Sequence, residues 1–181
     1  AGSRVDLVRS SIGMVVRAGA PKPDISSVAA LTRTLLQAKS IAYSASASGV
    51  YLSTELFPRL GIADQVKSKV RRIESERVAA VVARGDAEIG FQQISELLFV
   101  PGVELVGPLP GDAQRVTVFS AGLASGARAP DAARALIRFL ASPAVVPAIT
   151  KSGLEPVARV RDRMPPIPAD KMTDEQKQAV A

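Results

Sequence analysis

The residues best suited to chemistry are the serines and the glycine of the stretch 44–50, SASASGV. A short apolar run, 40–43, precedes them and favours a buried strand, and apolar residues at helical spacing follow them as far as Gly61. Small side chains at the start of a helix leave its first N–H groups accessible. Those groups and the positive end of the helix dipole suit an anion. Capping of the helix by Ser48 explains the same residues without any ligand.

Two further groups of polar residues could take part in such a site. Gln92 and Gln93 end a predicted strand and offer both donors and acceptors, although a strand end facing water accounts for them equally well. Glu74, Glu76 and Glu96 could act as acid–base groups, and solvated helix ends are the alternative explanation.

The composition excludes several kinds of chemistry. The 181 residues are enough for one domain with a substantial core, and they include no Cys, His or Trp. Thiol catalysis, disulfides, the usual zinc sites and imidazole-activated serine hydrolysis are therefore absent, and we expect no metal and no cofactor. The net charge of +6 favours anions. Lys and Arg are scattered and poorly interleaved with aromatic residues, so we expect no nucleic-acid partner.

Apolar runs and helical patterns alternate along most of the chain. This alternation predicts an α/β fold with a three-layer, mostly parallel sheet. Helices are expected after Ser26 or Ser27, over 50–60, from about 74 to Gly85, and over 130–140 and 143–153. The expected strands are 12–17, 40–43, 69–73, 88–93, 103–106 and 114–124.

The order of several stretches resembles one known family. Residues 40–56, 78–90 and 89–97, and then 135–143 with 153–156, are similar in order and spacing to the periplasmic substrate-binding proteins of molybdate-type ABC transporters. The resemblance implies the type II periplasmic-binding fold, in which two α/β lobes are joined by crossover strands and an oxyanion binds in the cleft. It also implies a periplasmic location and an ABC permease as partner.

The resemblance assigns site residues one by one. Ser48 matches a residue that donates a backbone N–H, Ser75 matches a second such donor at a helix start, and Gln93 stands where the family has a tyrosine hydroxyl. The change to Gln93 leaves room for an organic acid in place of molybdate. The candidate ligand-binding residues are Ser46, Ser48, Gly49, Tyr51, Ser75, Gln92 and Gln93.

The resemblance also divides the chain into parts. Residues 1–21 correspond to a hinge strand and a remnant of the first lobe, 22–105 to a nearly complete second lobe, and 106–157 to the return hinge and the C-terminal part of the first lobe. Residues 158–181 are expected to form an extended tail. In that family more first-lobe residues precede a stretch like 7–16, so we expect an incomplete first lobe and a homodimer through its exposed face.

Three functions follow as expectations. The first is a solute-binding protein that captures a molybdate-like oxyanion or an organic carboxylate for ABC import. The second is an isomerase of a small tricarboxylate, resembling aconitate isomerase, with Glu96 or Tyr51 as the base. The third is a half-lobe remnant that binds no ligand and dimerises.

Overall fold

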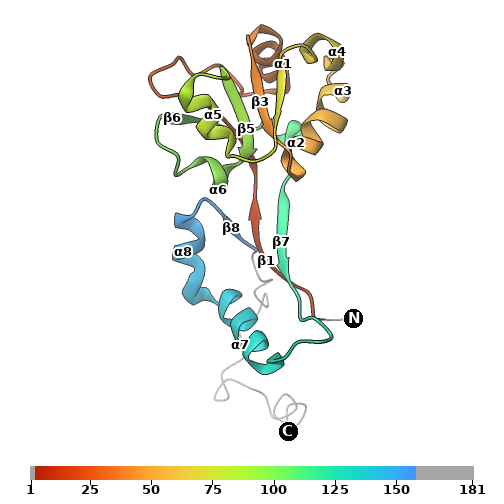
Figure 1. Cartoon of the computed structure of the whole chain (residues 1–181), viewed down its shortest axis with the longest axis vertical. Helices are drawn as coiled ribbons and strands as arrows, with labels where there is room; N and C mark the ends of the chain where they lie inside the picture. Colours follow the sequence, from red (N-terminus) through yellow and green to blue (C-terminus); the bar gives the residue numbers. More distant parts are fainter. Residues whose placement is uncertain (1–2, 158–181) are drawn as a thin grey trace, which may run out of the picture.

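The computed structural model describes residues 3–157 and contains two sheets that the chain connects at two places (Figure 1). The larger sheet has the order β4–β3–β5–β2–β6, and the smaller has the order β7–β1–β8. The strands of the larger sheet are β2 (Ile12–Arg17), β3 (Ile41–Ser44), β4 (Val70–Ile73), β5 (Ile89–Gln93) and β6 (Val103–Pro108). Those of the smaller sheet are β1 (Val5–Ser10), β7 (Thr117–Ala121) and β8 (Glu155–Pro156).

The predicted α/β class is confirmed, but the larger sheet is mixed. Strands β4, β3 and β5 are parallel, whereas β2 is antiparallel to both β5 and β6. The reason is the point at which β2 enters the sheet. It comes directly from β1 and begins with Ile12 opposite Gln93, the last residue of β5, so it must run back along β5.

Helices cover both faces of the larger sheet and make two separate cores. One core contains Ile41 and Tyr43 of β3, and the other contains Ala42 of the same strand, because alternate side chains point to opposite faces. This explains why every residue of β3 is buried. The first face carries α1 (Val28–Gln37), α2 (Ala47–Tyr51), α3 (Phe57–Arg59) and α4 (Ala63–Val66), and the second carries α5 (Val78–Arg84) and α6 (Ile94–Leu97).

The ends of two helices follow the sequence signals. Ser27 is the N-cap of α1, and its hydroxyl accepts a hydrogen bond from the Ala30 N–H at 3.1 Å. Gly85 ends α5 with φ +85°, and Gly61 also has a positive φ after α3, as predicted for both.

The helix expected over 50–60 begins earlier and is interrupted. It starts at Ala47, and a π-helical segment, Leu52–Leu56, separates α2 from α3. The hydroxyls of Ser53 and Thr54 donate to backbone carbonyls one turn back, at 2.9 and 2.8 Å. These side-chain bonds compete with the regular α-helical ladder, which accounts for the local widening.

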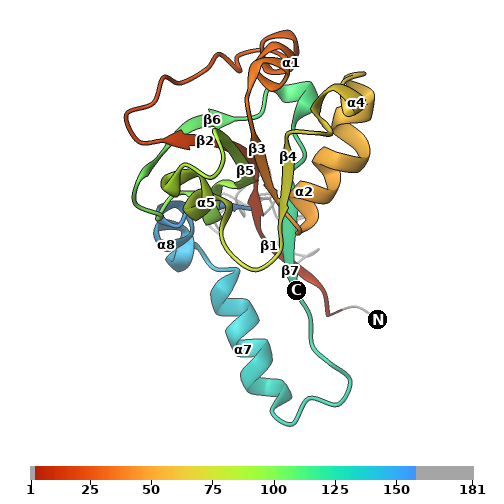
Figure 2. The ribbon, with the colours of Figure 1, turned by 45° about the horizontal axis from the view of Figure 1, so that its top comes forward.

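Two chain crossings connect the sheets (Figures 1 and 2). One runs from β1 through Ser11 into β2, and the other runs from β6 through a 3₁₀ turn, Gly111–Ala113, into β7. Strand β7 was expected over 114–124 and is shorter. Helices α7 (Pro130–Leu140) and α8 (Val146–Lys151), with a 3₁₀ turn at Pro143–Val145 between them, lie beside the smaller sheet.

The smaller sheet and its helices leave apolar surface uncovered in the described part of the chain. Helix α7 has no buried residue, and Leu136 and Phe139 are each 57% exposed. A cavity of about 600 Å³ lies between this sheet and the two helices, with Leu7, Phe119 and Ile149 among its walls. No single helix among the described residues is long and apolar enough to cross a membrane; α7 and the segment 143–151 meet that test only as a pair bent by 60°. The tail expected over 158–181 lies outside the described residues.

Candidate functional site

A polar cavity of about 330 Å³ lies where the three parallel strands end. Strands β3, β4 and β5 run in the same direction, so their carboxyl ends meet at one edge of the sheet. Ligands of open α/β sheets characteristically bind at this edge, beyond the carboxyl ends of the strands. The cavity is lined by Ser44 at the end of β3 with Ala45 and Ser46 after it, by Ile73 at the end of β4 with residues 74–77 after it, and by Gln92 of β5.

Three serine hydroxyls form a closed cluster beside this cavity. Ser44 Oγ lies 2.7 Å from Ser46 Oγ and 3.0 Å from Ser48 Oγ, and the last two oxygens are 3.3 Å apart. Ser44 and Ser46 line the cavity, while Ser48 is 1% exposed and lies behind them. Each hydroxyl can donate or accept, so these protons can turn toward an anion at little cost.

The expectation that Ser48 caps the helix is wrong. Ser46 is the N-cap residue of α2, and its side chain makes no capping hydrogen bond. Its hydroxyl is bonded to the two neighbouring serines instead. The serine hydroxyls are therefore available at the cavity and are not used to hold the helix end.

Gly49 brings α2 onto the end of β3. A Cβ atom at this position would lie 1.7 Å from the carbonyl oxygen of Ser44 and 2.7 Å from the Tyr43 ring. Only glycine permits so close an approach. Gly49 does not line the cavity, and it positions the serine cluster by letting the helix begin directly above Ser44.

Gln92 supplies an amide to the cavity wall. The side chain is 7% exposed, and its Oε1 accepts a hydrogen bond from the Val78 N–H at 3.0 Å. Because that bond fixes the oxygen, the amide nitrogen is left as a donor. Among residues 3–157 this nitrogen has no hydrogen-bond partner and it is not fully buried, so it is an accessible donor in the cavity wall.

The same bond changes the role predicted for Ser75. Helix α5 begins at Val78, with Arg77 as its N-cap, so Ser75 lies in the preceding loop and not at the helix start. The first N–H of the helix already donates to Gln92. Ser75 does line the cavity and is exposed. Any hydrogen bond from Ser75 to a ligand would therefore come from the loop before α5 and not from the start of the helix.

Charged side chains surround the mouth of the cavity. Glu74 pairs with Arg72 at 3.0 Å. Glu76 receives two hydrogen bonds from Arg84, at 2.7 and 3.0 Å, and this pairing lowers the pKa of Glu76 below its ordinary value. Each carboxylate therefore has an arginine partner, although Arg84 also pairs with Asp86 at 3.1 Å. Arg77 also lines the cavity, and its side chain makes no hydrogen bond or salt bridge among the described residues.

Tyr51 belongs to the core and not to the cavity. It is 3% exposed, and its hydroxyl donates to the Ala113 carbonyl at 3.0 Å and accepts from Arg59 at 3.1 Å. The Arg115 guanidinium lies 4.5 Å from the ring centroid. Every polar capacity of this side chain is used within the fold, so we remove it from the candidate ligand-binding residues.

Gln93 points to the crossing between the two sheets. Its side chain is 3% exposed and does not line the cavity. With its amide nitrogen directed at the carbonyl oxygen of Ser10, it donates at 2.9 Å, and its Oε1 accepts from Thr117 Oγ1 at 2.7 Å. The residue expected to replace a tyrosine ligand thus joins β5 to the strands of the smaller sheet.

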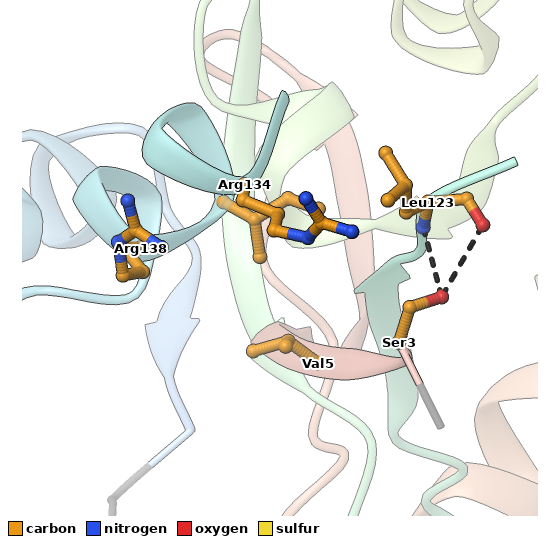
Figure 3. Close-up of a pocket in the computed structure, with 6 residues that line it drawn as sticks. Ser3, Val5, Leu123, Arg134 and Arg138 are labelled. Atoms are coloured by element: carbon orange, nitrogen blue, oxygen red, sulfur yellow. Dashed lines mark hydrogen bonds between the residues drawn. The ribbon is translucent and has the colours of Figure 1, made fainter. Parts of the chain in front are cut away.

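A second hollow, of about 340 Å³, lies beside α7 (Figure 3). Arg134 and Arg138 reach it from the helix, and Ser3 and Leu123 lie on its other side. Arg134 is already paired with Asp131 at 2.9 Å, and the Ser3 hydroxyl bonds to Leu123. Within residues 3–157 no group of three or more His, Cys, Asp or Glu side chains could hold a metal ion.

Of the candidate residues from the sequence, Ser46, Ser75 and Gln92 line this cavity and Ser48 lies beside it, whereas Arg77, which also lines it, was not among the candidates. Nothing in the local pattern separates Arg77 from the other arginines near it. Its place in the cavity depends on the loop after β4, whose path a single sequence does not reveal.

Comparison of the amino-acid sequence with known proteins found a matching family model and a similar curated protein. Residues 1–155 match the model of a family described as bacterial extracellular solute-binding protein. A curated relative, aconitate isomerase of Pseudomonas sp., is 54% identical over 155 residues. That match covers 86% of this chain, which spans 59% of the relative's length.

Solved structures share the fold at low identity. The substrate-binding domain assigned to a molybdenum ABC transporter from Clostridium difficile superposes with a TM-score of 0.67 at 20% identity, over 86% of this chain and 67% of that one. A periplasmic thiamin-binding protein gives 0.66 at 16% identity, over 88% and 55%. The fold is therefore that of periplasmic binding proteins, and the chain belongs to the family of bacterial extracellular solute-binding proteins.

Proposed function

We propose that the cavity at the ends of β3, β4 and β5 binds a small anion, and that the chain serves as part of a solute-binding protein. The observation that supports this most strongly is the concentration of uncharged donors there. Two nearly buried serine hydroxyls, Ser44 and Ser48, and the amide of Gln92 lie together with no carboxylate bonded to them among the described residues. The serine hydroxyls are bonded to one another and the Gln92 amide nitrogen has no acceptor among the described residues, so these protons can be offered to an anion.

A titration of the 181-residue chain tests this proposal. The chain, labelled with ¹⁵N, is followed by NMR while sulfate, tungstate, citrate or trans-aconitate is added at constant ionic strength. We expect saturable shifts of the amides at 44–49 and of the Gln92 side-chain NH₂, with dissociation constants in about the millimolar range. The absence of saturable shifts there with every anion would contradict the proposal.

Substitutions locate the binding. Ser46→Ala removes one donor from the cavity and should weaken binding by about threefold to tenfold, the usual contribution of one hydrogen bond. Ser68→Ala is the matched control, because Ser68 is exposed and does not line the cavity. Equal affinity in the wild type and both variants would place the anion elsewhere.

A second candidate function is isomerisation of aconitate, which the 54%-identical relative specifically favours. An allylic shift of this kind removes a proton from one carbon and returns one to another, so a base must lie beside the bound acid. Tyr51 is bonded to Ala113, and Glu96 does not line the cavity. Glu74 and Glu76 do line it, and Glu74 is the better candidate because the hydrogen bonds from Arg84 lower the pKa of Glu76 and make that carboxylate a weaker base.

Proton exchange distinguishes this function from binding alone. The chain is incubated with trans-aconitate in D₂O, and the ¹H spectrum is followed for deuterium incorporation and for the cis isomer. Isomerisation predicts both signals in the wild type and their loss in Glu74→Gln, while Glu74→Gln should still bind the acid. Binding without exchange in the wild type would exclude the activity for this chain.

The remaining expectations about partners stay proposals. Members of the family and its structural relatives are extracellular or periplasmic proteins that bind small solutes. By analogy, we infer a periplasmic location and an ABC permease as the partner of the complete protein. Three further predictions stay proposals. They are a molybdate-like oxyanion as an alternative ligand, additional first-lobe residues in the protein, and a homodimer.

A further inference from the structure

The charged residues that line the cavity differ in whether they are paired. Glu74 and Glu76 each have an arginine partner, Arg72 and Arg84, neither of which lines the cavity. Arg77 does line it and has no carboxylate partner among the described residues. Among the described residues, Arg77 is therefore the charged lining residue that has no ion-pair partner.

The hydrogen-bond donors in the interior of the cavity differ in charge from the donor at its rim. Ser44 and Gln92 are 4% and 7% exposed and donate through neutral groups, whereas Arg77 is exposed and donates through a charged, planar one. A guanidinium matches the two oxygens of a carboxylate, and a charge-assisted pair of this type is stronger than a neutral hydrogen bond.

The size of the cavity is also informative. A volume of about 330 Å³ equals the space of roughly ten water molecules, far more than a tetrahedral oxyanion needs. It falls in the range of sites for small organic ligands. The cavity therefore has room for an organic acid that carries acceptor groups at two ends.

We infer that Arg77 is a specificity-determining residue that selects an organic acid with two or more carboxylates. One carboxylate lies against the hydroxyls of Ser44 and Ser46 and the Gln92 amide, and another pairs with the Arg77 guanidinium at the rim. This assignment rests on the proposed function, because it names the class of anion that the same cavity holds.

Differential affinity tests the assignment. Tricarballylate and sulfate are titrated separately into the wild type, Arg77→Gln, Arg77→Lys and Arg33→Gln, with the NMR readout described above. Arg33→Gln makes the same change in net charge on α1, at an exposed residue that does not line the cavity. Far-UV circular dichroism verifies that each variant is folded.

We expect Arg77→Gln to weaken tricarballylate binding by about tenfold or more while changing sulfate binding by less than about threefold. Arg77→Lys should fall between, because an ammonium keeps the charge and loses the paired geometry. Arg33→Gln should match the wild type. Equal weakening of both anions by Arg77→Gln, or no weakening of either, would overturn the assignment. Wild-type binding of sulfate without tricarballylate would overturn it and leave the proposed site standing, and binding of neither would overturn both.

Discussion

At the scale of single residues, the site depends on how closely a helix approaches a strand. Gly49→Ala would force a Cβ against the Ser44 carbonyl oxygen, which belongs to the backbone and cannot turn aside. We expect a loss of stability of more than about 3 kcal/mol, at the upper end of the cost of overpacking. Urea unfolding followed by circular dichroism measures it. Gly111→Ala is the control, since no atom lies within 4 Å of the place that its Cβ would take, and it should change stability by less than about 0.5 kcal/mol.

The residue pattern predicted the serine-rich turn but not the hydrogen bonds that its side chains make. The SASASGV stretch correctly indicated a strand, a small-residue turn and a helix, because each of these has a local signal. The bonds that give Ser48 and Tyr51 their roles run to partners chosen by tertiary packing. Ser48 turned out to lie behind the cavity wall, and the hydroxyl of Tyr51 bonds to Ala113, which lies far away in the sequence.

At the scale of elements, two glutamines fasten the crossings between the sheets. Gln114 Oε1 accepts from the Ile12 N–H at 2.8 Å, and Gln114 Nε2 donates to the Ile12 carbonyl at 3.0 Å, as a neighbouring strand would. Gln93 makes a similar connection to Ser10 and Thr117. These bonds lie where β1 continues into β2 and where the chain returns to β7.

Loss of the Gln114 bonds should loosen this junction. Gln114→Ala leaves the N–H of the fully buried Ile12 without its partner, which costs about 1–3 kcal/mol. We expect faster hydrogen exchange at the Ile12 amide than in the wild type. Gln37→Ala, at an exposed residue ending α1, is the control and should leave that exchange rate unchanged. Unaltered exchange in Gln114→Ala would show that the side chain does not support the crossing.

The ends of helices were predicted where the sequence carries a local signal. The direction of a strand within the sheet was not predicted. Ser27 and Gly85 marked the ends of helices correctly. The antiparallel course of β2 could not be predicted, because it depends on where the strand enters the sheet and not on its own residues.

At the scale of the whole molecule, the described chain has one well-covered sheet and one that is poorly covered. Leu136 and Phe139 of α7, and Val118 and Phe119 of β7, are each more than 40% exposed. Exposed apolar surface of this kind favours association. We expect the average mass measured by light scattering to rise with protein concentration. Phe139→Glu should reduce the rise. Val50→Glu replaces an exposed apolar side chain of α2, on the larger sheet, by the same charged one and should not reduce it. A constant monomer mass at all concentrations would contradict the expected homodimer.

The most direct measurement is a crystal structure of the chain grown with tricarballylate. The predicted result is one carboxylate within hydrogen-bond distance of Ser46 Oγ and Gln92 Nε2, with the serine hydroxyls no longer satisfied only by one another. Tricarballylate bound solely in the hollow beside Arg134 and Arg138, with the serine cluster and Gln92 unchanged, would contradict the assignment of the anion site to the ends of β3, β4 and β5.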